Sequence, residues 1–64
     1  MDQFVALQWL HTMLESVRAY EKEIASLIDQ EDKLITLDQI SNLYGYAECI
    51  ASEQRQCEDE LKGK

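Results

Sequence analysis

The chain has no proline and only two glycines, Gly45 and Gly63, among its 64 residues. These are the residue types that most often interrupt helices, so only Gly45 interrupts a helical pattern before the C-terminus. A glycine inside a helix costs about 1 kcal/mol relative to alanine. We expect Gly45 to be a tolerated, exposed glycine or a mild kink. The alternative is that the backbone of a partner approaches closely there.

Metal ligands and disulfides are also scarce. The two cysteines, Cys49 and Cys57, have no further ligand at the short spacings of a zinc site, and His11 is the only histidine. On one helix the two cysteines would lie about 12 Å apart, which is too far for a disulfide. No metal or other cofactor is therefore expected. A chain of this size gains little stability from its own core, so a partner chain is the remaining source.

Long apolar runs and basic clusters are absent as well. The chain begins without the basic segment of a signal peptide, and no run approaches the roughly 18 apolar residues of a membrane span. We therefore expect a cytoplasmic protein with no membrane contact. Thirteen acidic residues against six scattered basic ones give a net charge of −7, which opposes direct binding to nucleic acid. This acidity favours encounter with basic partners.

What the chain does contain is apolar residues at helical spacing. With Leu10 written as position a of a heptad, one apolar stripe runs through nearly seven turns. Its a and d positions hold Ala6, Leu10, Met13, Val17, Tyr20, Ile24 and Leu27, and its e position holds Leu7, Leu14 and Ile28. The pattern predicts one long helix over about residues 3–31.

A second stripe follows in a different phase. Its a and d positions hold Ile40, Leu43, Ala47, Ile50, Cys57 and Leu61, and its e position holds Leu37, Tyr44 and Ala51. The phase is displaced by two residues from that of the first stripe, which one continuous helix does not absorb. The chain should therefore break between the stripes. Gln54 is polar at an a position, where it either fixes the register or marks an opening to water.

The start of the second helix has its own signal. Thr36 and Gln39 form the T-x-x-Q pattern of a capping box, and Asp38 places a negative charge in the first turn, where the helix dipole favours it. The second helix is predicted over about residues 37–62, after a turn over 32–36. The fold class is thus all-α: residues 1–64 form a single antiparallel two-helix hairpin, coiled-coil-like, which a partner or dimerisation completes into a bundle.

Catalysis is the easiest function to reject. Antiparallel folding would bring His11 level with Cys57, an arrangement that could activate a thiol. However, His11 falls at position b, away from the stripe that holds Cys57, and no third group orients the imidazole. A lone buried cysteine usually serves as a small hydrophobic residue. We therefore expect no enzyme, no catalytic residue and no small-molecule substrate.

The first helix also has apolar residues off its main stripe. Phe4, Val5 and Trp9 would lie at the open end of the hairpin, where a tryptophan often dominates an interface. The alternative is that they cover the end of the bundle within this chain or its dimer mate. The predicted partner-binding residues are Phe4, Val5, Trp9, Leu10, Met13, Val17, Tyr44, Tyr46 and Ile50.

The flanking positions e and g are acidic and lack lysine and arginine. They hold Glu21, Glu23, Glu53, Glu58 and Glu60, which we interpret as an electrostatic rim. In this register a self-paired bundle would set acid near acid, whereas a helix with basic flanking residues would find complementary charge. The alternative is that these side chains are simply solvated.

By length, acidity and layout, the whole chain resembles the small helical-hairpin co-chaperones of type III secretion. The resemblance is carried by the amphipathic segment from Phe4 to Ile28, the cap at Thr36 to Gln39, and the stripe from Leu37 to Leu61. Such co-chaperones hold a needle or filament subunit soluble by pairing helices with it. The resemblance implies a similar adaptor here, and no binding residue is carried over from the family.

The expected function is therefore a non-enzymatic protein-binding module that pairs its helices with a helical protein, with a second copy of itself, or with both. One alternative is a phage-type acidic inhibitor that imitates nucleic acid or blocks a basic protein surface. A second alternative is a homodimeric four-helix bundle resembling the small RNA-binding plasmid regulators. The few basic residues weigh against the second alternative.

Overall fold

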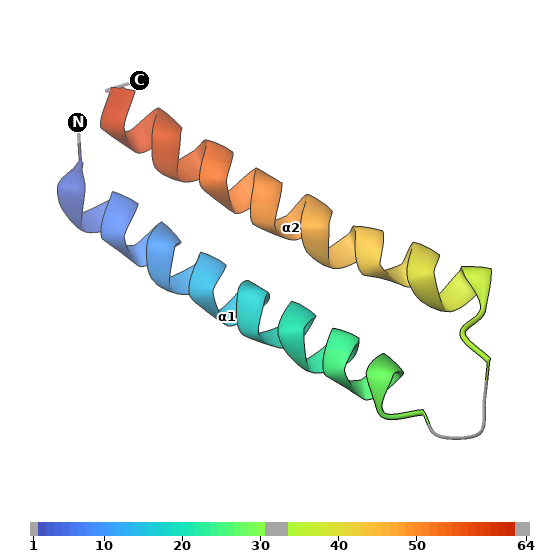
Figure 1. Cartoon of the computed structure of the whole chain (residues 1–64). Coiled ribbons are helices and arrows are strands. Elements are labelled where there is room, and N and C mark those ends of the chain that lie inside the picture. Colours follow the sequence, from blue (N-terminus) through green and yellow to red (C-terminus); the bar gives the residue numbers. More distant parts are fainter. Residues whose placement is uncertain (1, 31–33, 63–64) are drawn as a thin grey trace.

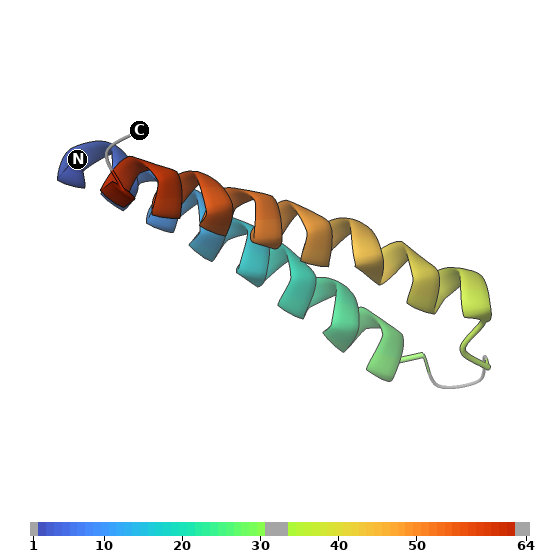
Figure 2. The same cartoon turned by 90° about the horizontal axis from the view of Figure 1, so that it is seen from above.

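Two long helices make up the computed structural model, which describes residues 2–30 and 34–62. The helix α1 spans Gln3–Ile28, and the helix α2 spans Leu37–Lys62. They run antiparallel, with both termini at the end of the hairpin opposite the turn (Figure 1). Viewed from above, the helices cross at a shallow angle (Figure 2). The predicted all-α two-helix hairpin is confirmed.

Asp2 starts α1 and also ties it to the end of α2. Its Oδ1 atom accepts a hydrogen bond from the backbone N–H of Val5 at 3.0 Å, which satisfies one of the free amides of the first turn. The backbone N–H of Asp2 donates to the carbonyl oxygen of Glu60 at 3.1 Å. One residue thus caps the first helix and occupies a carbonyl in the last turn of the second, a role that our sequence analysis did not assign.

The first helix ends at Ile28, three residues earlier than predicted. The backbone N–H of Asp29 still donates to the carbonyl oxygen of Ala25 at 3.0 Å, but Gln30 is no longer helical. Instead, the side-chain oxygen of Gln30 accepts from the Nε2 atom of Gln39 at 2.7 Å, which links the two ends of the turn. Residues 31–33, in the predicted turn and at the predicted helix end, lie outside the described residues.

The capping box at the start of α2 is confirmed. The N–H of Gln39 donates to the Oγ1 atom of Thr36 at 3.2 Å, and the N–H of Thr36 donates to the Oε1 atom of Gln39 at 3.0 Å. The helix begins at Leu37 and ends at Lys62, as the sequence predicts. It continues through Gly45, so that glycine does not end the helix.

Few side chains are fully enclosed, because two helices touch along a single line. Among the described residues only Ala6, Leu27 and Cys57 are buried, with exposed fractions of 4%, 7% and 8%. The half-buried residues of α1 are Val5, Trp9, Met13, Ser16, Tyr20 and Glu23, Gln30 is half-buried just after it, and those of α2 are Gln39, Leu43, Tyr46, Ala47, Ile50, Glu53, Asp59 and Glu60. Most of these fall at positions d and g, which therefore form the seam between the helices.

The register of this seam differs from the a and d pairing expected from the sequence. Cross-helix contacts identify it directly. The rings of Tyr20 and Tyr46 stack with centroids 5.7 Å apart, and the thiol of Cys57 donates to the carbonyl oxygen of Ala6 at 3.5 Å. On the same seam, the hydroxyl of Ser16 donates to the Oε2 atom of Glu53 at 3.1 Å. The d residues face the other helix as expected, but g residues, not a residues, accompany them.

We predict that Thr36→Ala destabilises the protein by about 1 kcal/mol, since it removes the acceptor of the capping box. Thr12→Ala is the matched control, because Thr12 is exposed in the interior of α1 and its hydroxyl bonds only the carbonyl oxygen of Gln8. Alanine has the higher helix propensity, so this control should leave stability unchanged or raise it slightly. Thermal unfolding at one fixed concentration measures both. Equal losses for the two variants would contradict the assignment of the cap.

We also predict that Gly45→Ala raises the free energy of unfolding by about 0.5 to 1 kcal/mol. Gly45 is exposed within α2, and a Cβ atom added there would meet no atom within 4 Å. Chemical denaturation compares the variant with the unmodified chain. A loss of stability would instead indicate that another chain packs closely against this glycine.

Candidate protein-binding face

A row of mostly apolar side chains is left exposed on each helix. The exposed residues at positions a and e of α1 include Leu10 and Leu14, which keep 49% and 45% of their surface accessible. We define the apolar face as these two rows: Leu7, Leu10, Leu14, Val17, Ile24 and Ile28 from α1, with Leu37, Ile40, Tyr44, Ala47, Ala51 and Leu61 from α2. All are exposed except Ala47, which is half-buried.

The two rows lie on the same side of the hairpin. In each helix, positions a and e follow the seam positions g and d by one residue, so each row is rotated from the seam in the same sense about its own helix axis. The two helices run in opposite directions (Figure 1). Because the two helix directions are reversed, equal rotations about the two axes move both rows to the same side of the hairpin. The rows therefore form one broad surface along the hairpin rather than two separate strips on opposite faces.

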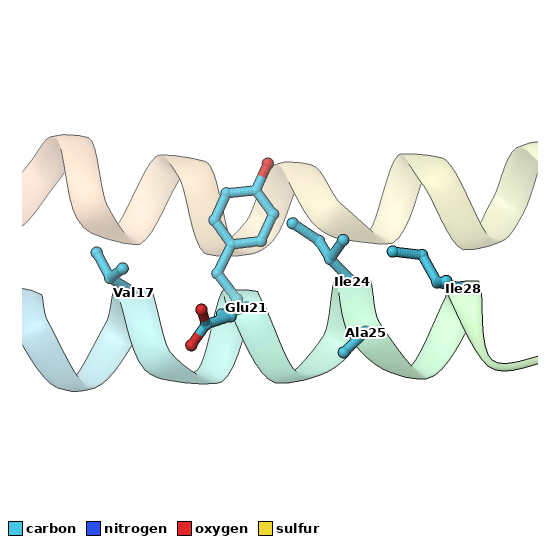
Figure 3. Close-up of a pocket in the computed structure, with 6 residues that line it drawn as sticks. Val17, Glu21, Ile24, Ala25 and Ile28 are labelled. Atoms are coloured by element: carbon cyan, nitrogen blue, oxygen red, sulfur yellow. The ribbon is translucent and has the colours of Figure 1, made fainter.

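An open groove of about 330 Å³ lies in this surface. All of its lining residues come from α1: Val17, Tyr20, Glu21, Ile24, Ala25 and Ile28. Figure 3 shows Val17, Ile24 and Ile28 in line along α1, with their side chains on the side toward α2. Glu21 is the one charged member of the lining. The groove can hold an apolar side chain from another helix and offers a carboxylate at its edge.

The predicted partner-binding residues divide into two groups. Phe4, Leu10, Val17 and Tyr44 are exposed, and three of them belong to the apolar face. Phe4 lies beside it at position b, with 69% of its surface accessible. Val5, Trp9, Met13, Tyr46 and Ile50 are half-buried, and all but Val5 lie at seam positions between the two helices. Trp9 is thus half-buried at seam position g, near the open end of the hairpin. Leu7, Leu14, Ile24 and Ile28 were in the predicted stripe but were not assigned to binding.

The predicted rim of glutamates is also divided by the structure. Glu23, Glu53 and Glu60 are half-buried at seam position g, on the side away from the apolar face. Only Glu21 and Glu58, at position e, are exposed within the apolar rows. The reason is again the register, because pairing through d and g places the g glutamates between the helices. The acidic flank expected around a binding surface is therefore mostly part of the hairpin itself.

The charges that do border the apolar face are balanced. Arg18, Arg55 and Lys62 occupy position b at its outer edges, and Lys22 is the only other basic residue in the described parts of the chain. The acidic residues in or beside the face are Glu21, Glu48 and Glu58. Three positive charges thus stand against three negative ones. Within residues 2–30 and 34–62 the other acidic residues lie at positions f and g.

No reactive constellation accompanies this surface in the described residues. Cys57 is buried and its thiol donates to a backbone carbonyl, whereas His11 is exposed at position b. Residues 2–30 and 34–62 contain no group of three or more side chains placed to hold a metal ion. Neither helix in those ranges contains a stretch long and apolar enough to cross a membrane. Comparison with protein-family models, curated proteins and solved structures finds no match for this chain.

We predict a structural role for Glu53 that a substitution pair can test. Its Oε2 atom bonds Ser16, while its Oε1 atom is buried and has no hydrogen-bond partner. Ser16→Ala should therefore cost about 1 to 3 kcal/mol, because the carboxylate keeps its burial and loses its donor. The double variant Ser16→Ala with Glu53→Leu should recover most of that loss, since both polar partners are replaced. Thermal unfolding of the variants checks this, and a double variant no better than Ser16→Ala would contradict it.

Proposed function

We propose that this chain is a non-enzymatic protein-binding module, and that its apolar face packs against the helices of another polypeptide chain. The observation that carries the proposal is that face itself. Its two rows lie on the same side of both helices, and all of their apolar members except the half-buried Ala47 are exposed. Monomeric proteins seldom expose a continuous apolar surface of this extent. Amphipathic helices bind partners through such rows of side chains.

The total surface of the chain supports the same proposal. The hairpin exposes 5289 Å², whereas the scaling of surface with mass gives about 4,200 Å² for a compact monomer of 7.5 kDa. The excess of about 1,000 Å² is close to the area that one partner buries in a standard interface, about 800 Å². Packing this face against another helical surface would remove the excess.

The adaptor role of a type III secretion co-chaperone is one specific form of this proposal, in which the occupant is a secreted helical subunit. An acidic inhibitor would instead bind through charge. The distribution of charge favours the apolar mode, because most acidic residues of the described chain lie at positions f and g, and the a and e rows, in which Glu21 and Glu58 are the only charged residues, are left open. An inhibitor that acts only through charge does not need exposed apolar rows.

Photo-crosslinking at adjacent positions tests the proposal. A photoreactive amino acid is placed at position 14, in the apolar face, or at position 12, which is also exposed but lies on the opposite side of α1. In the native host we expect crosslinks to protein at position 14 and few or none at position 12. Equal labelling at both positions, or no product at position 14, would overturn the proposal.

A charge placed in the face should remove that association. Leu10→Asp would bury a carboxylate without a partner, which costs several kcal/mol. We therefore predict that it lowers crosslinking at position 14 by more than about tenfold. Thr12→Asp introduces the same charge on the opposite side of α1 and should leave crosslinking at position 14 unchanged. Circular dichroism confirms that both variants remain helical.

A further inference from the structure

The geometry points to a second copy of this chain as the occupant of the apolar face. We propose that two hairpins pack face to face about a two-fold axis parallel to the helices. In this arrangement α1 of each copy lies against α2 of the other, and Arg18 of one copy pairs with Glu48 of the other. The inference rests on the proposed function, since it identifies the polypeptide that covers the same face.

Charge balance selects self-association over a basic partner. A chain with a net charge of −7 would repel its own copy if its acids surrounded the contact surface. Here the residues in and beside the apolar face carry three positive and three negative charges, so the local repulsion is removed. A strongly basic partner would meet Arg18, Arg55 and Lys62 at the edges and would be opposed by them.

The level of each charge along the hairpin follows from the contacts across the seam. Ser16 bonds Glu53, and Tyr20 stacks on Tyr46. Along α1, Arg18 lies between Ser16 and Tyr20. Along α2, Glu48 lies between Tyr46 and Glu53. Arg18 and Glu48 therefore stand at the same level, on opposite outer edges of one face. Both are exposed, and neither has an ion-pair partner in the described residues.

These positions choose between the two symmetric ways of stacking the hairpins. A two-fold axis along the helices exchanges the two edges and preserves the level, so it brings Arg18 opposite Glu48 of the second copy, twice. An axis across the helices would set α1 against α1 and α2 against α2. Glu48 would then face the Arg55 and Lys62 end of its own edge row, and Arg18 would depend on the edge row of α1. The edge row of α1 holds Phe4, His11, Arg18 and Ala25 and contains no acid, so Arg18 would then meet no complementary charge in that row.

The two-fold axis along the helices also places a side chain of the second copy in the groove on α1. Tyr44 is 69% exposed, and it lies between Tyr46 and Gln39, whose contacts are with Tyr20 and Gln30. It is therefore level with the part of α1 that lines the groove. In the proposed dimer the Tyr44 ring of the second copy fills the groove, and its hydroxyl is placed to donate to the Glu21 carboxylate. This contact accounts for a large exposed aromatic residue and for a charged residue in an otherwise apolar lining.

Charge reversal and its rescue test the pairing, with dimer dissociation constants measured by sedimentation equilibrium of the purified full chain at low salt. Arg18→Glu and Glu48→Arg should each weaken the dimer by roughly tenfold, because each creates two like-charge contacts. The double variant Arg18→Glu, Glu48→Arg should return to within roughly threefold of the unmodified chain, since it restores both pairs with reversed polarity.

Two other charge reversals are matched controls for net charge. Lys22→Glu changes the total charge as Arg18→Glu does, and Glu15→Arg changes it as Glu48→Arg does. Both control positions are exposed at position f, away from the apolar face. They should alter dissociation by less than roughly threefold. Tyr44→Ala should weaken the dimer by at least roughly tenfold, because the groove loses its aromatic occupant.

A chain that remains monomeric at all concentrations would overturn the inference, as would a double variant no tighter than the single ones. These failures can be told apart from failure of the proposed function. If the charge reversals have no effect while position 14 still crosslinks to a different protein, the second copy is excluded and the binding face stands. If position 14 captures nothing, both are overturned.

Discussion

Two helices packed side by side can cover only one row of side chains on each other, and this limit governs the rest of the structure. The chain has apolar residues at heptad positions a, d and e, a stripe too wide for one line of contact. The hairpin uses position d and joins it to g. Positions a and e remain outside on a common side, which is why so few residues are fully buried. The apolar face is the direct consequence of this geometry.

The use of position g in the seam has a physical reason in the pairs formed there. Ser16 with Glu53 and Gln30 with Gln39 are hydrogen-bonded across the helices, and Asp2 donates its backbone N–H to Glu60. Two polar pairs at g, Ser16 with Glu53 and Gln30 with Gln39, are thus hydrogen-bonded inside the hairpin, where d supplies the apolar contact. The apolar side chains that predominate in the a and e rows form no such hydrogen bonds and are better buried against another apolar surface. The division of roles between seam and face follows from where hydrogen bonds are available.

Much of the fold could be predicted from the sequence, because its signals are local. The capping box at Thr36 and Gln39 and the start of α2 depend on residues within a few positions of each other, and the structure confirms them. The seam register could not be predicted in the same way. Periodicity measures the width of an apolar stripe but does not say which part faces the neighbouring helix. Trp9 is an example, because it lies off the main stripe but is half-buried at position g, which belongs to the seam.

The same geometry limits how far association can proceed. The side of the hairpin opposite the apolar face carries uncharged and mostly small or polar residues at position c: Val5, Thr12, Ala19, Ser26, Asn42, Cys49 and Gln56. This surface has no apolar row to bind another hairpin, and the half-buried glutamates at g adjoin it. An interface built from the same face of both copies buries that face in each of them and leaves no second association surface exposed. The assembly therefore stops at a dimer and does not propagate into a fibre. A chain that exposes half of its apolar stripe can therefore still form a small, finite assembly.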